Sequence, residues 1–500
     1  MVTPVSSVEE RLGSARPGQP GQRVIQNRLL LAGIVAFVVV MGCWLGYAFS
    51  KPMSATLYPV DLRVYLDGGL IVRHSSPPYD GTLPYPLYDW PKNNEALKFT
   101  YTPFAALFFA VVSFIPWHLL PRVVQVANLI FLFGAGWFTM NGLGYSSRQV
   151  KLGGALLGMA AGLLTEPVFR TMYLGQINLL LMALILWDTT QPDTRRWKGI
   201  ATGLAAGIKI IPGIFILYFL LTKRFRAGIN EIVAFVATIA LGFVIVPGDS
   251  KDYWLKGLFF EDGRTGFTGW GGNQSLRGLM TRLAGSITAA TGPWLLIALL
   301  ATVAGLACAV VLDRAGHTML AILTTALIGL LDSPISWDHH WVWVVPGMIV
   351  AGHYAARAWQ DGKRRAALGC GGVAAGLLLI FAPWPGALWS KPSTGPGNFV
   401  DGLIWAGPNS PVTKYVKFGD QPWFTEYHWA GLQNLSGNAY ILAGIAMLIL
   451  IGIVALRVRR ASRVAPVSGP PAVPAAPDAP SASATPGASA TPGASTAANV

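Results

Sequence analysis

The stretch LLLAGIVAFVVVMGCWLGY, residues 29–47, decides the fold, because it carries no charged side chain and is long enough to cross a bilayer. A helix of about 20 apolar residues spans the hydrocarbon region. The stretch is too long for the core of a secretory signal peptide, and no clear small-residue cleavage site accompanies it. We therefore expect a first transmembrane helix that is retained in the protein.

The rest of the chain has the composition of a membrane protein. Of its 500 residues, 53% are apolar and only 12% are charged, whereas a soluble domain carries about 25% charged residues. Because several apolar runs are shorter than a span needs, we expect about ten to twelve crossings in an all-α polytopic membrane protein. The runs after the first are 103–117, 122–141, 152–164, 174–187, 199–221, 230–247, 290–312, 315–331, 341–355, 366–384 and 440–456.

The net charge of +14 does not indicate a nucleic-acid partner. Lys and Arg lie in short clusters beside apolar runs, which is the positive-inside pattern, and form no continuous basic stripe. We expect every cluster to be cytoplasmic; they fall within 11–28, 195–198, 223–226, 363–365 and 457–463. The three cysteines, Cys43, Cys308 and Cys370, lie in apolar segments without metal-ligand spacing, so we expect neither a metal nor a disulfide.

Two conflicts with simple crossing follow from these clusters. The run 199–221 has a basic cluster at each end and is interrupted by Lys209 and Pro212, which predicts a re-entrant hairpin rather than one span. The four apolar runs between 103 and 187 would also return the chain to the outside, whereas the basic cluster at 195–198 is expected inside. Either one short run there does not cross, or Arg148 and Lys151 break the positive-inside rule.

The domain organisation expected is one membrane domain, 28–460, between two disordered cytoplasmic tails, 1–27 and 461–500, which are polar or rich in Pro, Ala and Ser. With the N-terminus inside, the outward-facing regions are about 50–102, 248–289, 332–340 and 385–439. Their many Trp, Tyr, Asp and Asn residues suit a carbohydrate, although an ordinary aromatic belt has the same composition.

Two outward-facing segments contain candidate acid–base groups. Asp61 follows the first helix closely, and a carboxylate at a membrane pocket can serve as a general base; the alternative is a solvated Asp paired with Arg63. His339 and His340 stand between two apolar runs. Neighbouring helical side chains diverge by about 100°, so we expect one His to act and the other to be structural, and no metal between them.

Three further groups indicate an anionic ligand within the membrane region. The stretch 166–178 contains Arg170, Tyr173, Gln176 and Asn178, which are costly in a bilayer unless they line a polar cavity. Lys209 lies in mid-run, where a phosphate is a fitting partner unless the side chain reaches to a membrane surface. Asn273, Gln274 and Arg277 offer amides and a guanidinium for hydroxyl and phosphate groups.

Together these groups fit a lipid-phosphate sugar donor, and a lipid or polysaccharide transporter or a non-catalytic scaffold remains an alternative. Six motifs in order along the chain resemble glycosyltransferase family 87, whose members are actinobacterial mannosyltransferases of the GT-C type. They are Asp61-Leu-Arg-Val-Tyr65, Lys98-Phe-Thr-Tyr-Thr-Pro-Phe104, Tyr173-Leu-Gly-Gln-Ile-Asn178, Gly207-Ile-Lys-Ile-Ile-Pro212, Asn273-Gln-Ser-Leu-Arg-Gly278 and Ser333-Pro-Ile-Ser-Trp-Asp-His-His-Trp-Val-Trp-Val-Val-Pro346.

The resemblance implies a GT-C bundle in the plasma membrane with its site facing outward. It implies an inverting transfer from polyprenyl-phosphate mannose to a mannosylated glycolipid, without a cofactor. The chain is most similar to the α-1,2-mannosyltransferases that extend phosphatidylinositol mannosides, and lipomannan branching is the alternative. Asp61 matches the family's catalytic Asp, and His339 or His340 its His.

The remaining candidate residues are assigned to the two substrates. We expect the donor phosphate to be bound by Lys209, Arg277, Gln274 and Asn273. The expected substrate-binding residues are Arg63, Tyr65, Tyr101, Tyr173, Gln176, Asn178 and Trp337. The sequence departs from the family at Thr102, where a Pro is usual, and at an additional Asp332.

Overall fold

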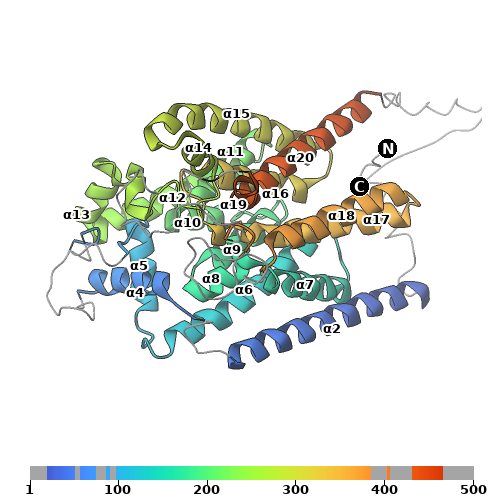
Figure 1. Cartoon of the computed structure of the whole chain (residues 1–500), viewed down its shortest axis with the longest axis horizontal. Helices are drawn as coiled ribbons and strands as arrows, with labels where there is room; N and C mark the ends of the chain where they lie inside the picture. Colours follow the sequence, from blue (N-terminus) through green and yellow to red (C-terminus); the bar gives the residue numbers. More distant parts are fainter. Residues whose placement is uncertain are drawn as a thin grey trace, which may run out of the picture.

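The computed structural model describes residues 20–50, 57–74, 86–89, 97–384, 402–405, 429 and 431–464, and these form helices joined by loops (Figure 1). The described residues contain no strand beyond two isolated bridges. The first helix, α2 (Pro20–Ser50), begins before residue 28, where the sequence placed the start of the membrane domain. Residues 1–19 and 465–500, most of the two expected tails, lie outside the described residues.

Six described helices are long and apolar enough to cross a membrane, and they confirm an all-α polytopic membrane protein. They are α2, α6 (Leu120–Gly142), α12 (Phe225–Ile245), α15 (Ile287–Arg314), α18 (Arg364–Phe381) and α20 (Ala439–Val464). The pair α7 (Arg148–Leu163) and α8 (Glu166–Leu174), bent by 77°, supplies a seventh candidate.

Shorter helices complete the bundle. Four apolar ones are α5 (Pro103–Val112), α9 (Asn178–Thr189), η1 with α11 (Ile211–Gly213 and Ile214–Leu221), and α16 (Thr318–Asp332). Length and composition therefore show six or seven spans, and the expected ten to twelve are reached only by counting shorter helices. The others are α4 (Val60–Val72), α10 (Ile200–Ile208), α13 (Pro247–Ser250), α14 (Leu276–Ala284), α17 (Val344–Gln360), α19 (Leu432–Gly437), and the single-turn elements η2 (Lys251–Leu255), η3 (Leu258–Phe260), η4 (Asp262–Thr265) and η5 (Asp338–Trp343).

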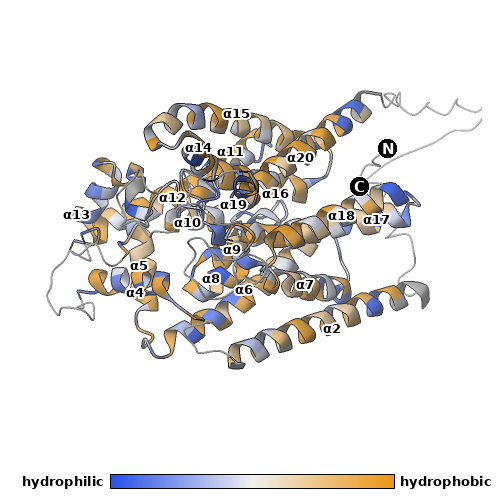
Figure 2. Cartoon of the chain, in the orientation of Figure 1, coloured by the Kyte–Doolittle hydropathy of each residue, from blue (hydrophilic) through white to orange (hydrophobic). Residues whose placement is uncertain are grey.

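The long helices consist largely of hydrophobic residues (Figure 2), and many of their large apolar side chains are exposed. On α15, Leu296, Leu299 and Val303 are each 60% exposed, and on α2 Val38 and Val39 are similarly exposed. Such a surface would be unfavourable in water, but lipid is as apolar as the side chains. The exposed apolar surface thus identifies the faces of α2 and α15 that contact lipid.

The segment 199–221 folds back on itself as a hairpin, and its re-entrant position in the membrane stays a prediction. At one end of α12, Gly199 packs directly against Ala227 and Leu220 against Gly228, so both ends of the segment meet there. Arg224 also donates to Asp193 at 3.0 Å across the same end. The hairpin turns at Lys209, whose extended backbone separates α10 from η1.

The tip of the hairpin lies near the far end of α12. Gly207 packs against Thr238, which precedes Ile245, the last residue of α12, by about 10 Å at 1.5 Å per residue. The Thr102 hydroxyl donates to the Gly207 carbonyl and also caps α5 by accepting from Ala105 N. The hairpin therefore brings Lys209 beside the loop that precedes α5, away from the basic clusters.

Candidate active site

Asp61 lies in the first turn of α4 with one carboxylate oxygen held in place. The Gln176 Nε2 donates to Asp61 Oδ2 at 2.7 Å. Gln176 Oε1 accepts from the Tyr65 hydroxyl at 2.5 Å and from the Tyr101 hydroxyl at 3.3 Å. Because a carboxylate only accepts, the Asp61 contact fixes the Gln176 amide with its NH₂ toward Asp61 and its oxygen toward the two hydroxyls. Tyr65, Tyr101 and Gln176, expected to bind substrate, here position the carboxylate instead.

The surroundings of Asp61 favour a base. Burial raises the pKa of the Asp61 carboxyl above its usual value, while a charge on His339, the Gln176 hydrogen bond and the Arg170 guanidinium limit the rise. A carboxylate with a raised pKa accepts a proton more readily. Asp61 Oδ1 makes no hydrogen bond to any residue in the described part of the chain, so this oxygen can accept a proton from a ligand.

The two neighbouring histidines of η5 face different partners. The His339 Nδ1 lies 2.9 Å from Asp338 Oδ1, and its Nε2 is buried without a partner among the described residues. The His340 Nε2 lies 2.7 Å from Lys209 Nζ. The ring planes are 87° apart, which separates their directions as expected for neighbours on one helix. That only one of the pair acts stays a prediction.

Lys209, held by His340 and Asn178, forms a site for an anion. The His340 ring is neutral because burial, with the nearby Lys209 charge, lowers the pKa of His340 well below its usual value. An ammonium can only donate, so Lys209 Nζ donates to His340 Nε2 at 2.7 Å. The contacts with Asn178 and His340 use two of the three N–H groups of Lys209, and an anionic oxygen would accept from the third.

One short segment joins the Asp61 and Lys209 sites. Asn178, two residues after Gln176, accepts from Lys209 Nζ at 3.2 Å and donates to the His339 carbonyl at 2.9 Å. Lys209 is thus held by interior polar groups and does not reach toward a membrane surface. Asn178, expected to bind substrate, fixes the cation and η5 relative to the carboxylate.

A chain of buried charges supports η5 from behind. Arg170 Nε lies 3.1 Å from Asp338 Oδ2 and 3.5 Å from Glu166 Oε1. The Trp405 indole and the Tyr440 hydroxyl donate to the two Glu166 oxygens at 3.2 and 3.0 Å. Although burial acts to raise it, the pKa of Asp338 lies well below its usual value because of Arg170 and His339. Asp338 is therefore an ionised partner that holds the His339 ring.

The amide cluster before α14 is bonded to backbone groups, unlike the free amides that the sequence predicts for phosphate binding. Asn273 donates to the Pro334 carbonyl at 3.2 Å and accepts from Ser336 N at 2.9 Å. Gln274 donates to the carbonyls of Gly271 and Gly437 at 2.6 and 2.7 Å. Both amides are fully buried and bonded at both ends, so they fix the loop before η5 and offer nothing to a donor.

Four other predicted residues have packing contacts. The Arg277 guanidinium lies 4.8 Å from the Trp294 ring of α15, and that of Arg63 lies 4.2 Å from the Trp117 ring. Tyr173 packs its ring on Phe169, with the centroids 5.9 Å apart. Trp337 begins η5 and packs on Trp270 at 5.4 Å. These contacts are packing contacts, and the expected part of the four residues in ligand binding stays a prediction.

Asp332 and the segment after 384 also bear on the site. The Thr302 hydroxyl of α15 donates to Asp332 at 2.5 Å, so this additional carboxylate binds a neighbouring helix. Most of the outward-facing region 385–439 lies outside the described residues, but Gly402–Trp405 is described and Trp405 supports Glu166.

Sequence reasoning left Asp338, Glu166 and Arg282 out of the site. Glu166 and Arg170 are four residues apart within one polar stretch, a spacing that places them on one helix face and could have indicated their pairing. Arg282 donates to the Asn273 carbonyl and to Asn438 Oδ1, at 2.9 and 2.8 Å; no local sequence signal pairs it with α19 and α20. The described residues contain no cluster of three or more metal-ligating side chains.

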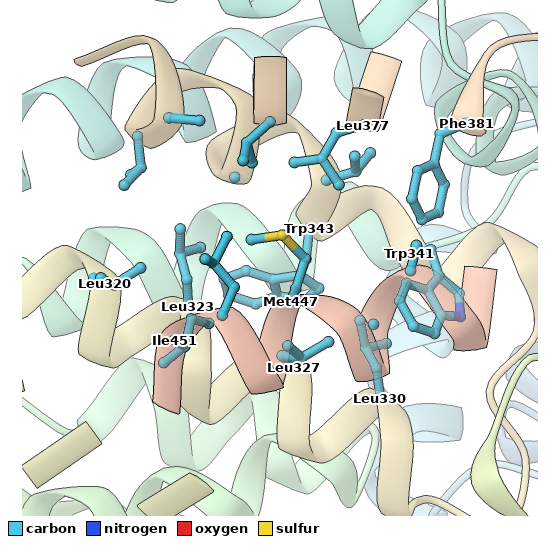
Figure 3. Close-up of a pocket in the computed structure, with 18 of the residues that line it drawn as sticks. Leu320, Leu323, Leu327, Leu330, Trp341, Trp343, Leu377, Phe381, Met447 and Ile451 are labelled. Carbon is cyan, nitrogen blue, oxygen red and sulfur yellow. The ribbon is translucent and has the colours of Figure 1, made fainter. Parts of the chain in front are cut away.

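An apolar cavity of about 180 Å³ lies on the other side of η5, between α16, α17, α18 and α20. Figure 3 shows Leu330, Trp341 and Phe381 at one end and Leu320 and Ile451 toward the other. Leu320 and Leu330 are about 15 Å apart along α16. The cavity thus starts beside the residue that follows His340 and runs along the helices.

Comparison with known proteins gives a consistent result. Residues 99–334 match the model of glycosyltransferase family 87. A Mycobacterium tuberculosis protein named polyprenol-phosphate-mannose-dependent alpha-(1-2)-phosphatidylinositol pentamannoside mannosyltransferase is 34% identical over 75% of this chain and 83% of its own length. A protein of the same name from Mycolicibacterium smegmatis is 31% identical over 88% and 95%. No solved structure matches the chain.

Proposed function

The chain belongs to glycosyltransferase family 87, and we propose that it transfers mannose from polyprenyl-phosphate mannose to the 2-hydroxyl of a mannose on a phosphatidylinositol mannoside. One observation carries the proposal. The segment Gln176–Asn178 holds a carboxylate at one end and an ammonium paired with an imidazole at the other. A base and an anion site held together suit a displacement at a carbon bonded to phosphate.

The chemistry follows from these positions. The acceptor hydroxyl attacks the anomeric carbon of the donor and transfers its proton to Asp61 Oδ1, while the bond from that carbon to the phosphate oxygen breaks. Attack opposite the leaving group inverts a β-linked donor to an α-linked product. A positioned general base contributes about 10²–10⁴-fold to the rate.

The leaving phosphate is stabilised at the other end of this segment. The Lys209 ammonium, held by His340 and Asn178, directs its third N–H to the developing charge on the phosphate. His339, fixed through Asp338, presents its unpaired Nε2 to a hydroxyl of one of the sugars. We leave Asn273 and Gln274 out of this donor site because their amides are bonded within the framework, and binding of the phosphate by Arg277, which packs on Trp294, stays a prediction.

The apolar cavity beside η5 supports a donor with a long hydrocarbon chain. It begins at Trp341, the residue after His340, and its lining is almost entirely aliphatic and aromatic. An isoprenoid chain attached to a phosphate at Lys209 would be shielded from water there without any polar group losing a partner. We place the polyprenyl chain of the donor in this cavity.

We further propose that the site faces outward from the plasma membrane. Helix α5 rises about 15 Å, half the hydrocarbon thickness, so it does not cross by itself. With α5 excluded, Arg148 and Lys151 join the other basic clusters on the cytoplasmic side, and residues 28–460 form one transmembrane domain between cytoplasmic tails. About ten crossings remain, namely α2, α6, α7, α9, α12, α15, α16, α17, α18 and α20.

The test is a transfer assay with purified protein in detergent, where no sealed compartment exists. We expect radiolabelled mannose from polyprenyl-phosphate mannose to appear in phosphatidylinositol mannoside, with a new 1,2-linkage found by methylation analysis. If only lipomannan is labelled, the acceptor is lipomannan and not phosphatidylinositol mannoside. No transfer in detergent, combined with movement of labelled lipid across sealed vesicles, would contradict the proposal and establish a transporter.

A further inference from the structure

A second pocket, of about 110 Å³, lies between the loop before η5 and the segments around Tyr88 and Tyr253, and its chemistry differs from that of the apolar cavity. Its walls include the rings of Tyr88, Tyr253 and Phe259 together with the charged side chains of Glu261 and Arg264. Aromatic faces combined with a few converging polar groups are typical of a site for a small polar ligand. None of these residues has a part in the proposed chemistry.

The pocket is built by fixed contacts among its walls. The Tyr88 and Tyr253 rings are stacked with centroids 5.4 Å apart, and Phe259 packs on Tyr253 at 6.0 Å. The Arg264 guanidinium donates to the Tyr88 carbonyl. Asp249 holds the same turn by accepting from Leu87 N at 2.8 Å. The aromatic walls therefore keep their positions without a ligand.

The pocket adjoins both segments that carry the catalytic groups. Thr100 lines it, and the next residue, Tyr101, accepts from the Tyr88 hydroxyl at 2.9 Å and bonds to the amide that holds Asp61. On the opposite wall, Ser333 and Pro334 lead into η5. A ligand in the pocket would thus lie between the segment of Tyr101, which helps to hold Asp61, and the loop before His339 and His340.

The wall chemistry selects the kind of ligand. The carboxylate of Glu261 would repel a phosphate, and a hydrocarbon chain would make no hydrogen bond to Glu261 or Arg264. A pyranose ring has apolar C–H faces that pack on aromatic rings and hydroxyl groups that bind a carboxylate and a guanidinium. Of the three ligand classes, only the sugar uses every wall of the pocket.

We propose that this pocket binds a hexose of the acceptor glycan, next to the mannose whose 2-hydroxyl reacts. The inference rests on the proposed function and adds a subsite to it: the pocket makes the enzyme select acceptors with at least two linked sugars. The reacting mannose lies between the pocket and Asp61, and the apolar cavity on the far side of η5 is left to the donor chain.

Kinetics with two synthetic acceptors test the subsite, one an alkyl mannoside and the other an alkyl dimannoside. We expect wild-type protein to prefer the dimannoside. In Arg264→Gln and Glu261→Gln the KM for the dimannoside should rise about 10- to 100-fold, as for the loss of hydrogen bonds to charged groups, with kcat little changed. The KM and kcat for the monomannoside should stay as in wild type, which also shows that the variants fold.

Lys256→Gln is the matched control, because it removes an exposed charge of η2's C-terminal end that lies outside the pocket. Equal effects on both acceptors, a similar effect in the control, or no preference by wild type would overturn the subsite. Calorimetric titration of wild type and Arg264→Gln with free mannobiose separates the two proposals. If the variant loses mannobiose binding, the subsite is supported even when the protein shows no transfer. If the variant and wild type bind mannobiose equally, the subsite is contradicted even when the protein shows transfer.

Discussion

The segments Gln176–Asn178 and Asn273–Gln274 are both rich in amides, and sequence reasoning assigned both to ligand binding. In the first, each amide holds a titratable side chain, Asp61 or Lys209. In the second, the amides are bonded to backbone groups of the loop before η5 and of α20. Amides of the same type thus position reacting groups in one segment and maintain the fold in the other, and mutations should separate these roles.

The largest effect in this comparison is expected at the cation that the first segment holds. Replacing Lys209 with Met removes the charge that stabilises the leaving phosphate, and kcat should fall about 10²–10³-fold. Steady-state kinetics with polyprenyl-phosphate mannose measure this. Lys151→Met, which removes a cation packed on Trp137, is the control and should keep its kcat. A normal kcat in Lys209→Met would contradict the assignment of Lys209 to the site for the leaving phosphate.

The next effect concerns Gln176, which positions Asp61 without touching substrate. Gln176→Ala should lower kcat about 10- to 100-fold. The wild-type rate should fall as the pH drops through the raised pKa of Asp61, since only the carboxylate accepts a proton. The lost hydrogen bond had lowered that pKa, so the acidic limb of the pH profile should move to higher pH.

Two variants sharpen the test of Gln176. Gln176→Glu should move the limb further in the same direction, because a second carboxylate disfavours ionisation of Asp61. Gln191→Ala, at a turn where the amide donates to the Trp187 carbonyl, should leave the profile unchanged. A drop in kcat without a moved limb would show that Gln176 serves only the fold.

The second segment should respond in stability instead of rate. Gln274→Ala leaves the buried carbonyls of Gly271 and Gly437 without donors, which should lower the free energy of unfolding by about 1–3 kcal/mol. Thermal unfolding in detergent should show a lower Tm, while kcat per folded molecule stays within about threefold of wild type. A large loss of kcat at unchanged Tm would show that Gln274 acts in the donor site and not in the framework.

The smallest effect is expected at Arg63, another residue that the sequence assigned to substrate. Its guanidinium lies over Trp117, a contact of about 0.5–1 kcal/mol at a partly exposed position. Arg63→Gln should lower the Tm slightly and leave the KM for both substrates unchanged. A several-fold rise in the KM for the acceptor would contradict this placement.

Much of the fold could be predicted from the sequence because hydrophobic length and Lys/Arg position report on the bilayer directly. The hairpin at Lys209 followed from two basic clusters at the ends of one run. What could not be predicted was the direction of individual amides. Asn178 and Asn273 have the same side chain and similar sequence surroundings, and only long-range contacts with Lys209 or with Ser336 distinguish them. Asp338 was missed for the same reason, since its partner Arg170 is distant in sequence.

Asp61 is the residue on which the account depends most directly. The measurement is mannose transfer by purified Asp61→Asn protein, with the Tm and the binding of polyprenyl-phosphate mannose determined on the same sample. Asn keeps the shape and a hydrogen-bond acceptor for Gln176 but cannot take the proton. We predict a fall in kcat of about 10²–10⁴-fold, with unchanged Tm and unchanged donor binding. Transfer at close to the wild-type rate would contradict Asp61 as the base.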